Sequence, residues 1–358
     1  MLSLPSSTKI FLAVEAVDMR KGFNGLWGIA QENVNGQSLA AEWAVGTESV
    51  AANSHVREII VSYAESDSKL QLFRVKDDGS PICKITDGKY DCMMPAWSPN
   101  GQKVVYVRQS QVGLDLWLCD PNGKNHKPLT QSGRNRMPSW LPDSKHVVWM
   151  VSTPGTGAQD PAANSQLRIL NTETMESRRL FSDDQQTRFS NAMPVVSPKG
   201  KQVAFVSNRS GNFRVWLSNL DGSDAKLISP VQANRDDGLD LPIEQKVPSW
   251  SPDGRWIAHW QGVEMIHMGR FTGKHNPKKD QQIAATFHVW IVGSDGTGKR
   301  KAGRGDDPNW SPDGAVTRSF PDPKKGGPNV MIESEHGWRE LPILPAGTTR
   351  YGRFTWKP

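Results

Sequence analysis

Three polar residues, Arg136, Lys246 and Asp306, each stand four positions before a tryptophan of a recurring motif. Tyr351 and Arg353 flank the corresponding place in the last copy. Positions that recur at one spacing in a repeat share one place in the fold, so we expect these side chains to surround one opening. A guanidinium group binds a carboxylate through two parallel hydrogen bonds. The five residues therefore predict a site for an anion or a sugar acid. The alternative is ordinary polarity around a water-filled channel.

Half of the histidines gather in one stretch, and imidazole is a common metal ligand. His259 and His267 are the two candidates for such a role, but the spacing of the group matches no standard metal motif. There is also no glycine-rich phosphate loop and no Gly-x-Ser-x-Gly elbow of a serine hydrolase. The sequence therefore predicts no bound metal and no cofactor, and it favours binding over catalysis. The histidines of this stretch are His259, His267, His275 and His288.

The recurring motif reads Pro-x-Trp-Ser-Pro-Asp-Gly and is complete at 248–254. Proline presets one backbone angle of a tight turn and glycine supplies a positive one, so the motif predicts a strand that ends in a turn. One copy has Val196 in place of tryptophan, and the last copy ends with the chain at Pro358. The other copies begin at Pro95, Pro138, Pro194, Pro308 and Phe354.

A second landmark follows each motif: an aromatic or apolar residue six positions before a turn glycine, as in Trp117 before Gly123. Apolar residues alternate around it, as in Phe213–Leu217, and a period of two predicts a strand. Each unit then holds four strands, and four-stranded units repeated every 40–60 residues are typical of a β-propeller.

The number of units predicts an all-β, six-bladed propeller closed by its own chain ends. The segment Glu58–Ile85 has three strands but no tryptophan strand before it, and Arg353–Trp356 is a tryptophan strand with nothing after it. Each completes the other, so we expect Arg353–Trp356 to pair with the strand near Ile59–Tyr63. This pairing would leave no open sheet edge.

The motif resembles the TolB-like family of WD40-like propellers over residues 57–358. That resemblance implies a non-catalytic scaffold that binds a protein or a small anionic ligand. Propeller lyases such as the oligogalacturonate lyases resemble the same repeat, which makes a carbohydrate-active enzyme on acidic sugars the alternative.

Residues 1–34 lie outside the repeat. The stretch Val17-Asp18-Met19-Arg20-Lys21-Gly22-Phe23 resembles the start of the accessory protein of IS-sixty-six-type insertion sequences. A transposition-associated role is therefore a further alternative, although only the first segment of that family is present. Residues 35–56 are small and polar without a period and predict a linker.

The loops predict which face of the propeller carries function. All Pro-Asp-Gly and Asp-Gly turns fall on one face, and the longer connections, with about twenty extra residues near Gly262–Thr286, fall on the other. Long loops on a rigid scaffold are where binding sites usually form. We therefore expect the ligand on the face with the long loops, around Arg136, Lys246 and Asp306.

The charge and composition of the 358 residues limit the partners. The net charge is +6, and the surplus lies between His267 and Arg304. Three cysteines at unrelated positions predict free thiols. Glu15 and Asp18 interrupt the first apolar run, so we expect no signal peptide and a cytoplasmic protein, with an exported ancestor as the alternative. The expected partner is a protein or a small anionic or carbohydrate ligand, without nucleic acid or membrane, and the propeller is expected to be a monomer.

Overall fold

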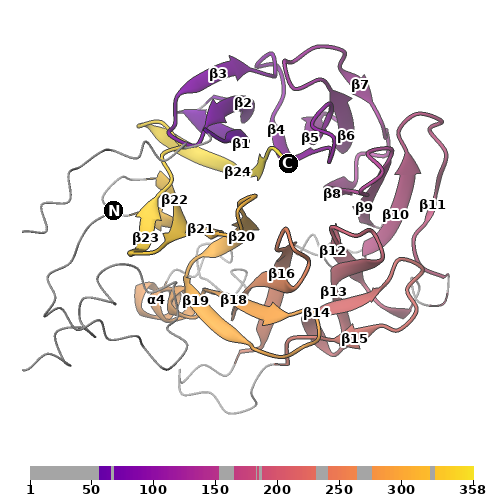
Figure 1. Cartoon of the computed structure of the whole chain (residues 1–358), viewed down its shortest axis with the longest axis vertical. Helices are drawn as coiled ribbons and strands as arrows, with labels where there is room; N and C mark the ends of the chain where they lie inside the picture. The colour runs from indigo at the N-terminus through magenta and orange to yellow at the C-terminus, as the bar shows by residue number, and fades with distance from the viewer. Residues whose placement is uncertain are drawn as a thin grey trace, which may run out of the picture. The chain divides into compact units, whose positions relative to one another are not determined.

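Six antiparallel four-stranded sheets form a ring around one axis (Figure 1). The computed structural model describes residues 56–65, 68–152, 165–182, 184, 188–230, 241–263, 276–322 and 327–358. The predicted leader, residues 1–34, and all but Val56 of the predicted linker lie outside these ranges. The described part is a six-bladed β-propeller, as predicted.

The blades are named A to F, and each is given with its innermost strand first. Blade A holds β24 (Thr348–Trp356), β1 (Glu58–Glu65), β2 (Gln71–Lys76) and β3 (Pro81–Lys84). Blade B holds β4 (Cys92–Trp97), β5 (Val104–Ser110), β6 (Gly113–Cys119) and β7 (Lys127–Pro128). Blade C holds β8 (Asn135–Trp140), β9 (His146–Ser152), β10 (Ser165–Asn171) and β11 (Ser177–Arg179).

Blade D holds β12 (Asn191–Val196), β13 (Gln202–Ser210), β14 (Asn212–Asn219) and β15 (Lys226–Leu227). Blade E holds β16 (Ile243–Trp250), β17 (Trp256–Val263), β18 (His288–Gly293) and β19 (Arg300–Arg304). Blade F holds β20 (Asp306–Trp310), β21 (Val316–Asp322), β22 (Gly327–Ser334) and β23 (Gly337–Glu340).

Blade A joins the two ends of the propeller, and this confirms the predicted closure. Strand β24 pairs antiparallel with β1, with Trp356 opposite Ile59 and Phe354 opposite Val61. Figure 1 shows β24, in yellow, beside the indigo strands of the first part of the chain. The pairing covers the inner edge of β1, whose backbone groups would otherwise lie open to water or to another chain.

The motif tryptophans connect neighbouring blades. Trp140 on β8 donates its indole N–H to the carbonyl of Ala96 on β4, at 3.0 Å. Trp250 makes the same bond to the carbonyl of Val195, at 3.0 Å, and Trp310 to that of Ser249, at 3.1 Å. A buried indole thus fills the space between two blades and satisfies a carbonyl of the preceding inner strand. The other two motif tryptophans differ, because Trp97 donates to the carbonyl of Gly101 in its own blade at 3.0 Å and the indole nitrogen of Trp356 is buried without a partner.

Each inner strand is bulged at one position, three residues before the tryptophan position. The residue there has a positive φ, from 46° at Asp307 to 78° at Arg353, and pairing with the second strand shifts register there, as between Met93 and Ala96. In five blades the next residue is a proline, which has no N–H to lose where the ladder is interrupted. The six bulge residues are Met94, Met137, Met193, Val247, Asp307 and Arg353.

The long insertion of blade E contains a helix that the sequence analysis did not predict. Helix α4 (Pro277–Ala285) begins after Asn276, whose side chain accepts a hydrogen bond from the backbone N–H of Lys279. Its Ile283 is fully buried and packs against Ile243 and Val263. The signal was present, since asparagine followed by proline is a common helix start. No helix in the part of the chain that the structure describes is long and apolar enough to cross a membrane.

Candidate functional site: an axial cavity closed by an ion pair

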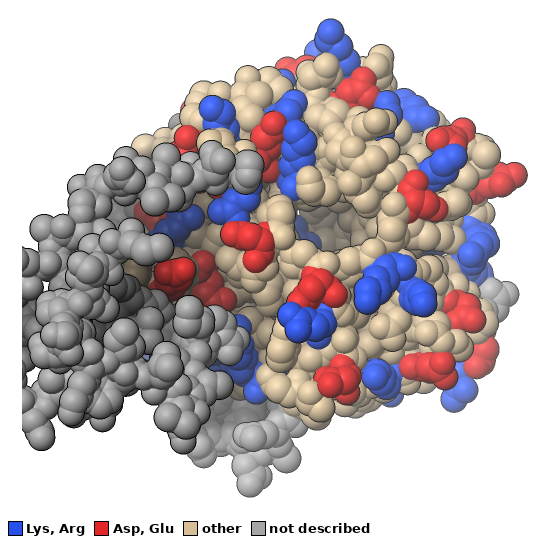
Figure 2. Space-filling view, viewed as in Figure 1, with Lys and Arg blue, Asp and Glu red and all other residues tan. Residues whose placement is uncertain are grey.

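A cavity of about 400 Å³ lies on the axis of the ring, on the side where the inner strands end. Figure 2 shows a hollow in the middle of the propeller. All six inner strands contribute the residue that directly precedes the tryptophan position, because period-two alternation points each of these side chains toward the axis. These six residues are Ala96, Ser139, Val195, Ser249, Asn309 and Thr355.

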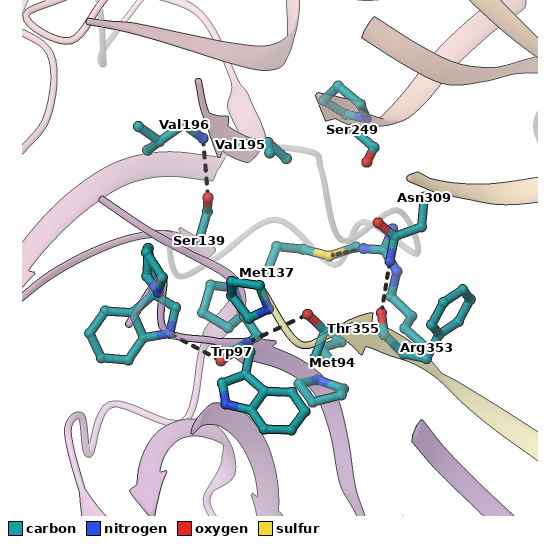
Figure 3. A pocket seen from close by; sticks show the side chains of 18 of the residues that line it. Met94, Trp97, Met137, Ser139, Val195, Val196, Ser249, Asn309, Arg353 and Thr355 are labelled. Atoms are coloured by element: carbon teal, nitrogen blue, oxygen red, sulfur yellow. Dashed lines mark hydrogen bonds between the residues drawn. The ribbon is translucent and has the colours of Figure 1, made fainter. Parts of the chain in front are cut away.

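The base of the cavity is an ion pair. The Arg353 guanidinium, from β24, bonds through Nε to the Asp307 carboxylate, from β20. Its Nη1 lies 2.9 Å from the Sδ atom of Met137 on β8 (Figure 3). The Tyr351 hydroxyl donates to the second Asp307 oxygen at 2.9 Å. Burial and the Asp307 charge raise the pKa of Tyr351 well above its ordinary value, so this hydroxyl stays protonated and remains a donor.

The polar groups on the wall of the cavity are mostly engaged by the neighbouring strand. The Ser139 hydroxyl accepts from the Val196 N–H at 3.1 Å, and the Thr355 hydroxyl accepts from the Trp97 N–H at 3.5 Å. Asn309 donates to the carbonyl of Phe354 at 3.1 Å. Figure 3 shows these bonds around the cavity. Among the described residues the hydroxyl of Ser249 has no such partner, which leaves it available to a ligand.

The rest of the lining is apolar. Trp97 and Trp140 contribute aromatic surface, and Met94 and Met137 contribute thioethers near the base. The turn prolines Pro99, Pro142 and Pro198 form part of the mouth. A cavity whose lining combines apolar and polar surface suits an amphipathic group such as part of a peptide. Charges do not dominate the surroundings, since Lys and Arg alternate with Asp and Glu over the described surface in Figure 2.

Of the five residues predicted as a site, Arg353 lines this cavity and Tyr351 supports it through Asp307. Lys246 is buried, with its Nζ 3.3 Å from an oxygen of Glu244, so its charge is already compensated. Asp306 accepts a hydrogen bond from the Ser319 hydroxyl, and burial raises the pKa of its carboxyl to about 6. Neither residue lines the cavity.

Arg136 stands apart from the other predicted residues. It pairs with Met150 and Ser139 pairs with Val148, so Arg136 and Ser139 point from the same face of β8, with Arg136 further from the turn side. Its Nε is buried without a hydrogen-bond partner. Burial lowers the pKa of this guanidinium, but arginine stays charged at neutral pH. A half-buried cation in this position remains a candidate for an anionic ligand.

The two histidine candidates lead to no metal site in the described residues. The His259 ring is fully buried, with Nε2 2.8 Å from the Ser229 hydroxyl and Nδ1 3.1 Å from the carbonyl of Trp260. Both ring nitrogens are thus engaged, and desolvation lowers the pKa of His259 to about 3. His267 lies outside the described residues. Over the ranges that the structure describes, no three His, Cys, Asp or Glu side chains lie close enough to hold a metal ion.

The sequence analysis missed two residues of the cavity wall, Asn309 and Ser249. A signal for them existed, because each stands one position before a motif tryptophan. The prediction used the position four before each tryptophan and the residues that flank it in the last copy. The bulge adds one residue to each inner strand, so the alternation of inward and outward side chains changes there and could not be followed by spacing alone.

Known proteins share this fold and repeat. The chain is 22% identical over 241 residues to dipeptidyl-peptidase 5 of Porphyromonas endodontalis, covering 57% of this chain and 34% of that protein. It is 31% identical over 88 residues to the Tol-Pal system protein TolB of Alcanivorax borkumensis, covering 24% of this chain and 20% of that protein. The chain thus spans between 20% and 34% of the length of these curated relatives.

Among solved structures, TolB from Acinetobacter baumannii superposes with a TM-score of 0.64 at 17% identity, over 85% of this chain and 69% of that chain. This likeness concerns the fold. Residues 50–289, more than half of the chain, match the family model described as the TolB beta propeller domain. Together with the six blades and their tryptophan motif, this match shows that the chain belongs to the TolB β-propeller family.

Proposed function

We propose that this chain is a non-catalytic scaffold that binds a protein partner through the axial cavity. The observation that carries the proposal is the construction of the cavity: each of the six blades contributes the residue before its tryptophan position, and the Arg353–Asp307 pair closes the base. Such a site is rigid, because its walls are paired strands. Rigid apolar walls with one free hydroxyl, that of Ser249, suit an inserted peptide segment more than they suit a reaction.

The relatives support a protein partner in general. TolB is by its name a component of the Tol-Pal system. The peptidase relative shares only a third of its length with this chain, so its activity is not carried over. The long loops that were expected to bind the ligand on the opposite face lie largely outside the described residues. The expectation of a ligand on that face stays a prediction, and the present proposal rests on the geometry of the axial cavity alone.

A cavity-filling substitution tests this proposal. Peptides are selected from a random phage-displayed library on the immobilised full chain, and the selected peptides are measured by fluorescence anisotropy. Ser249→Tyr projects a ring into the cavity and is expected to weaken binding at least about tenfold, or about 1.4 kcal/mol. Lys199→Tyr is the matched control, because Lys199 is exposed next to Pro198 but does not line the cavity.

Unchanged affinity in Ser249→Tyr, or an equal loss in Lys199→Tyr, would place the binding surface elsewhere and defeat the proposal. Both variants are first checked for a native near-UV circular dichroism spectrum, since Ser249 lies on a central strand. If Ser249→Tyr does not fold, Asn309→Leu serves instead. It removes the polar amide from the cavity wall while keeping a side chain of similar size.

A small anionic ligand beside Arg136 is the second candidate, favoured by the unpartnered Nε of its half-buried guanidinium. A short oligogalacturonate is a suitable probe, because its carboxylates can bond the guanidinium in pairs. Calorimetry should show binding to the native chain and a loss of at least about tenfold in Arg136→Gln. Absence of binding to the native chain, or equal binding to the variant, would rule this candidate out. Lys246→Ala is unsuitable as a test, because it would remove the ion pair with Glu244, whose side chain is only 14% exposed.

A further inference from the structure

One of the six blade interfaces lacks its tryptophan. In each of the other five, an inner-strand tryptophan packs in a cluster with apolar residues of the preceding blade. At the interface of blades C and D the corresponding residue is Val196. The ring therefore holds five indoles and one position where a much smaller side chain takes the place of a sixth. Those indoles are Trp97, Trp140, Trp250, Trp310 and Trp356.

The strand register shows what the missing indole would contact. Trp140 packs with Leu118 and Leu129 of blade B. In blade B, Leu118 pairs with Val105 on β5. Val148 on β9 has the same position in blade C, and it pairs with Ile169. Leu129, which follows β7, donates its N–H to the carbonyl of Leu116. In blade C, Leu180 makes the equivalent bond to the carbonyl of Leu167. Ile169 and Leu180 thus have the same positions in blade C as Leu118 and Leu129, which the indole of Trp140 covers in blade B.

At this interface the structure has a pocket of about 380 Å³. Ile169 and Leu180 line it, together with Leu141 of blade C and Leu220 from the turn after β14 in blade D. Leu141 and Leu220 are only partly buried and pack against the same cluster as Val196. Ile169 and Leu180 themselves are buried, so the apolar surface that the pocket leaves accessible is that of Leu141 and Leu220.

The mouth of the pocket carries polar groups. The carboxylate of Asp143 lies 2.7 Å from His146 Nδ1 and also accepts the backbone N–H of Lys145 at 2.9 Å. Glu176 and Arg178 lie on the same rim. The side-chain carboxylate of Glu176 makes no ion pair with the described residues, so it can accept a hydrogen bond from an incoming N–H. A flat apolar group with one N–H donor matches this combination of floor and rim.

The pocket and the axial cavity are separated by a single turn. Trp140 and Pro142 line the axial cavity, whereas Leu141 and Asp143 line the pocket. Successive residues of an extended chain point to opposite sides, so one turn forms a wall of both spaces. The pocket nevertheless has its own lining and opening, and a ligand in it needs nothing from the axial cavity.

We propose that the pocket between blades C and D binds an aromatic group of the indole type. The five occupied interfaces define the occupant, because they show that the same strand positions in the same fold pack against an indole ring. Burial of a flat aromatic ring against Leu141 and Leu220 supplies the affinity, and Glu176 receives the ring N–H. This inference is independent of the proposed function of the axial cavity.

Fluorine NMR with 5-fluoroindole as the probe tests the inference. The ¹⁹F line of the probe is expected to broaden and shift when the native full chain is added. Val196→Trp restores the missing indole from within, and Leu220→Trp fills the pocket from its open side. Each should reduce the affinity for the probe about tenfold or more. Val112→Trp is the control, because Val112 is 74% exposed on another blade and its variant should bind as the native chain does.

A narrow, unshifted line with the native chain would overturn the inference. So would equal broadening with the native chain and with both pocket-filling variants, since binding would then lie elsewhere. If Val196→Trp fails to fold, Leu220→Trp decides alone, because Leu220 lies in an exposed turn. Ser249→Tyr, which fills the axial cavity, should leave the probe titration unchanged, and a lost signal in that variant would assign the probe to the other cavity.

Discussion

The guanidinium of Arg353 on β24 lies 2.9 Å from the sulfur of Met137 on β8, although blades A and C are not neighbours in the ring. The same guanidinium bonds to Asp307 of blade F. One side chain thus contacts three blades across the axis at the level of the bulges. The channel is closed at this level, so a ligand that enters from the turn side reaches Arg353 and no further.

Arg353→Met should destabilise the fold by about 1–3 kcal/mol, because it leaves the mostly buried Asp307 carboxylate without its cation. The side chains of this pair are only 27% and 16% exposed, so solvent screens them weakly. Urea unfolding followed by tryptophan fluorescence measures the change. The double variant Asp307→Asn with Arg353→Met removes both charges and should recover much of the loss. A double variant as unstable as the sum of both single variants would show that the pair has no coupling energy.

Asp306 should make the protein less stable as the pH rises from about 4 to about 6. Desolvation raises the pKa of this carboxyl to about 6 in the folded protein, from an ordinary value of 3.8. Between these values the folded state binds more protons than the unfolded state, so stability falls with rising pH and stays lower above it. Asp306→Asn should therefore be more stable than the native chain at pH 7.5, by about 2–3 kcal/mol at most.

The Asp306→Asn difference should nearly disappear near pH 3, below the ordinary value of 3.8, where the carboxyl is mostly protonated in both states. Chemical denaturation at the two pH values measures it. Asn can still accept the hydrogen bond from the Ser319 hydroxyl, so loss of that bond does not contribute to the difference in stability. The same difference at both pH values would show that the effect does not come from the titration of Asp306.

Trp250→Phe should cost more than Trp216→Phe. Trp250 donates its indole N–H to the buried carbonyl of Val195, and phenylalanine leaves that carbonyl without a partner at a cost of about 1–3 kcal/mol. The indole N–H of Trp216 is buried without an acceptor, so its loss removes no hydrogen bond. Thermal unfolding of the two variants gives the comparison. Equal losses would mean that the interblade bond contributes nothing beyond the packing of the ring.

Removal of Tyr351–Pro358 should unfold blade A. These residues supply most of β24, and without them the inner edge of β1 and the cluster around Ile59 and Val61 lose their cover. Circular dichroism melting should show a large fall in the midpoint, or no cooperative transition. Deletion of residues 1–34 is the contrasting experiment, and we predict a change of only a few degrees there. A truncated chain as stable as the full one would contradict the role of β24.

The fold could be predicted from the sequence because one local rule repeats. The motif at 248–254 fixes a strand, a turn and a second strand, and six copies fix six blades. The closure by Trp356 opposite Ile59 followed from counting, since one strand was missing at one end and left over at the other.

The cavity could not be predicted in the same way, because its geometry depends on the bulge. The sequence analysis placed Lys246 and Asp306 on an open rim, but the structure pairs Lys246 with Glu244 and bonds Asp306 to Ser319. These partners come from the same or the adjacent strand of the same blade. They are determined by the side chains that share a face, and the position of the bulge decides which ones do. The prediction that a ligand binds on the face with the long loops stays a prediction, because most of these loops lie outside the described residues.

Blade A can close only late in synthesis, because its inner strand β24 is made after all the other strands. Strand β1 emerges early, but its inner partner β24 follows roughly 280 residues later, about 15–60 s at ordinary rates of synthesis. Until then the edge of β1, with Ile59, Ile60 and Val61, has no neighbour. Each later blade can pair its own four strands as soon as they leave the ribosome. The nascent chain therefore carries an exposed apolar strand until β24 has been made, which makes this strand the natural target for a chaperone and the first point of aggregation when one is lacking.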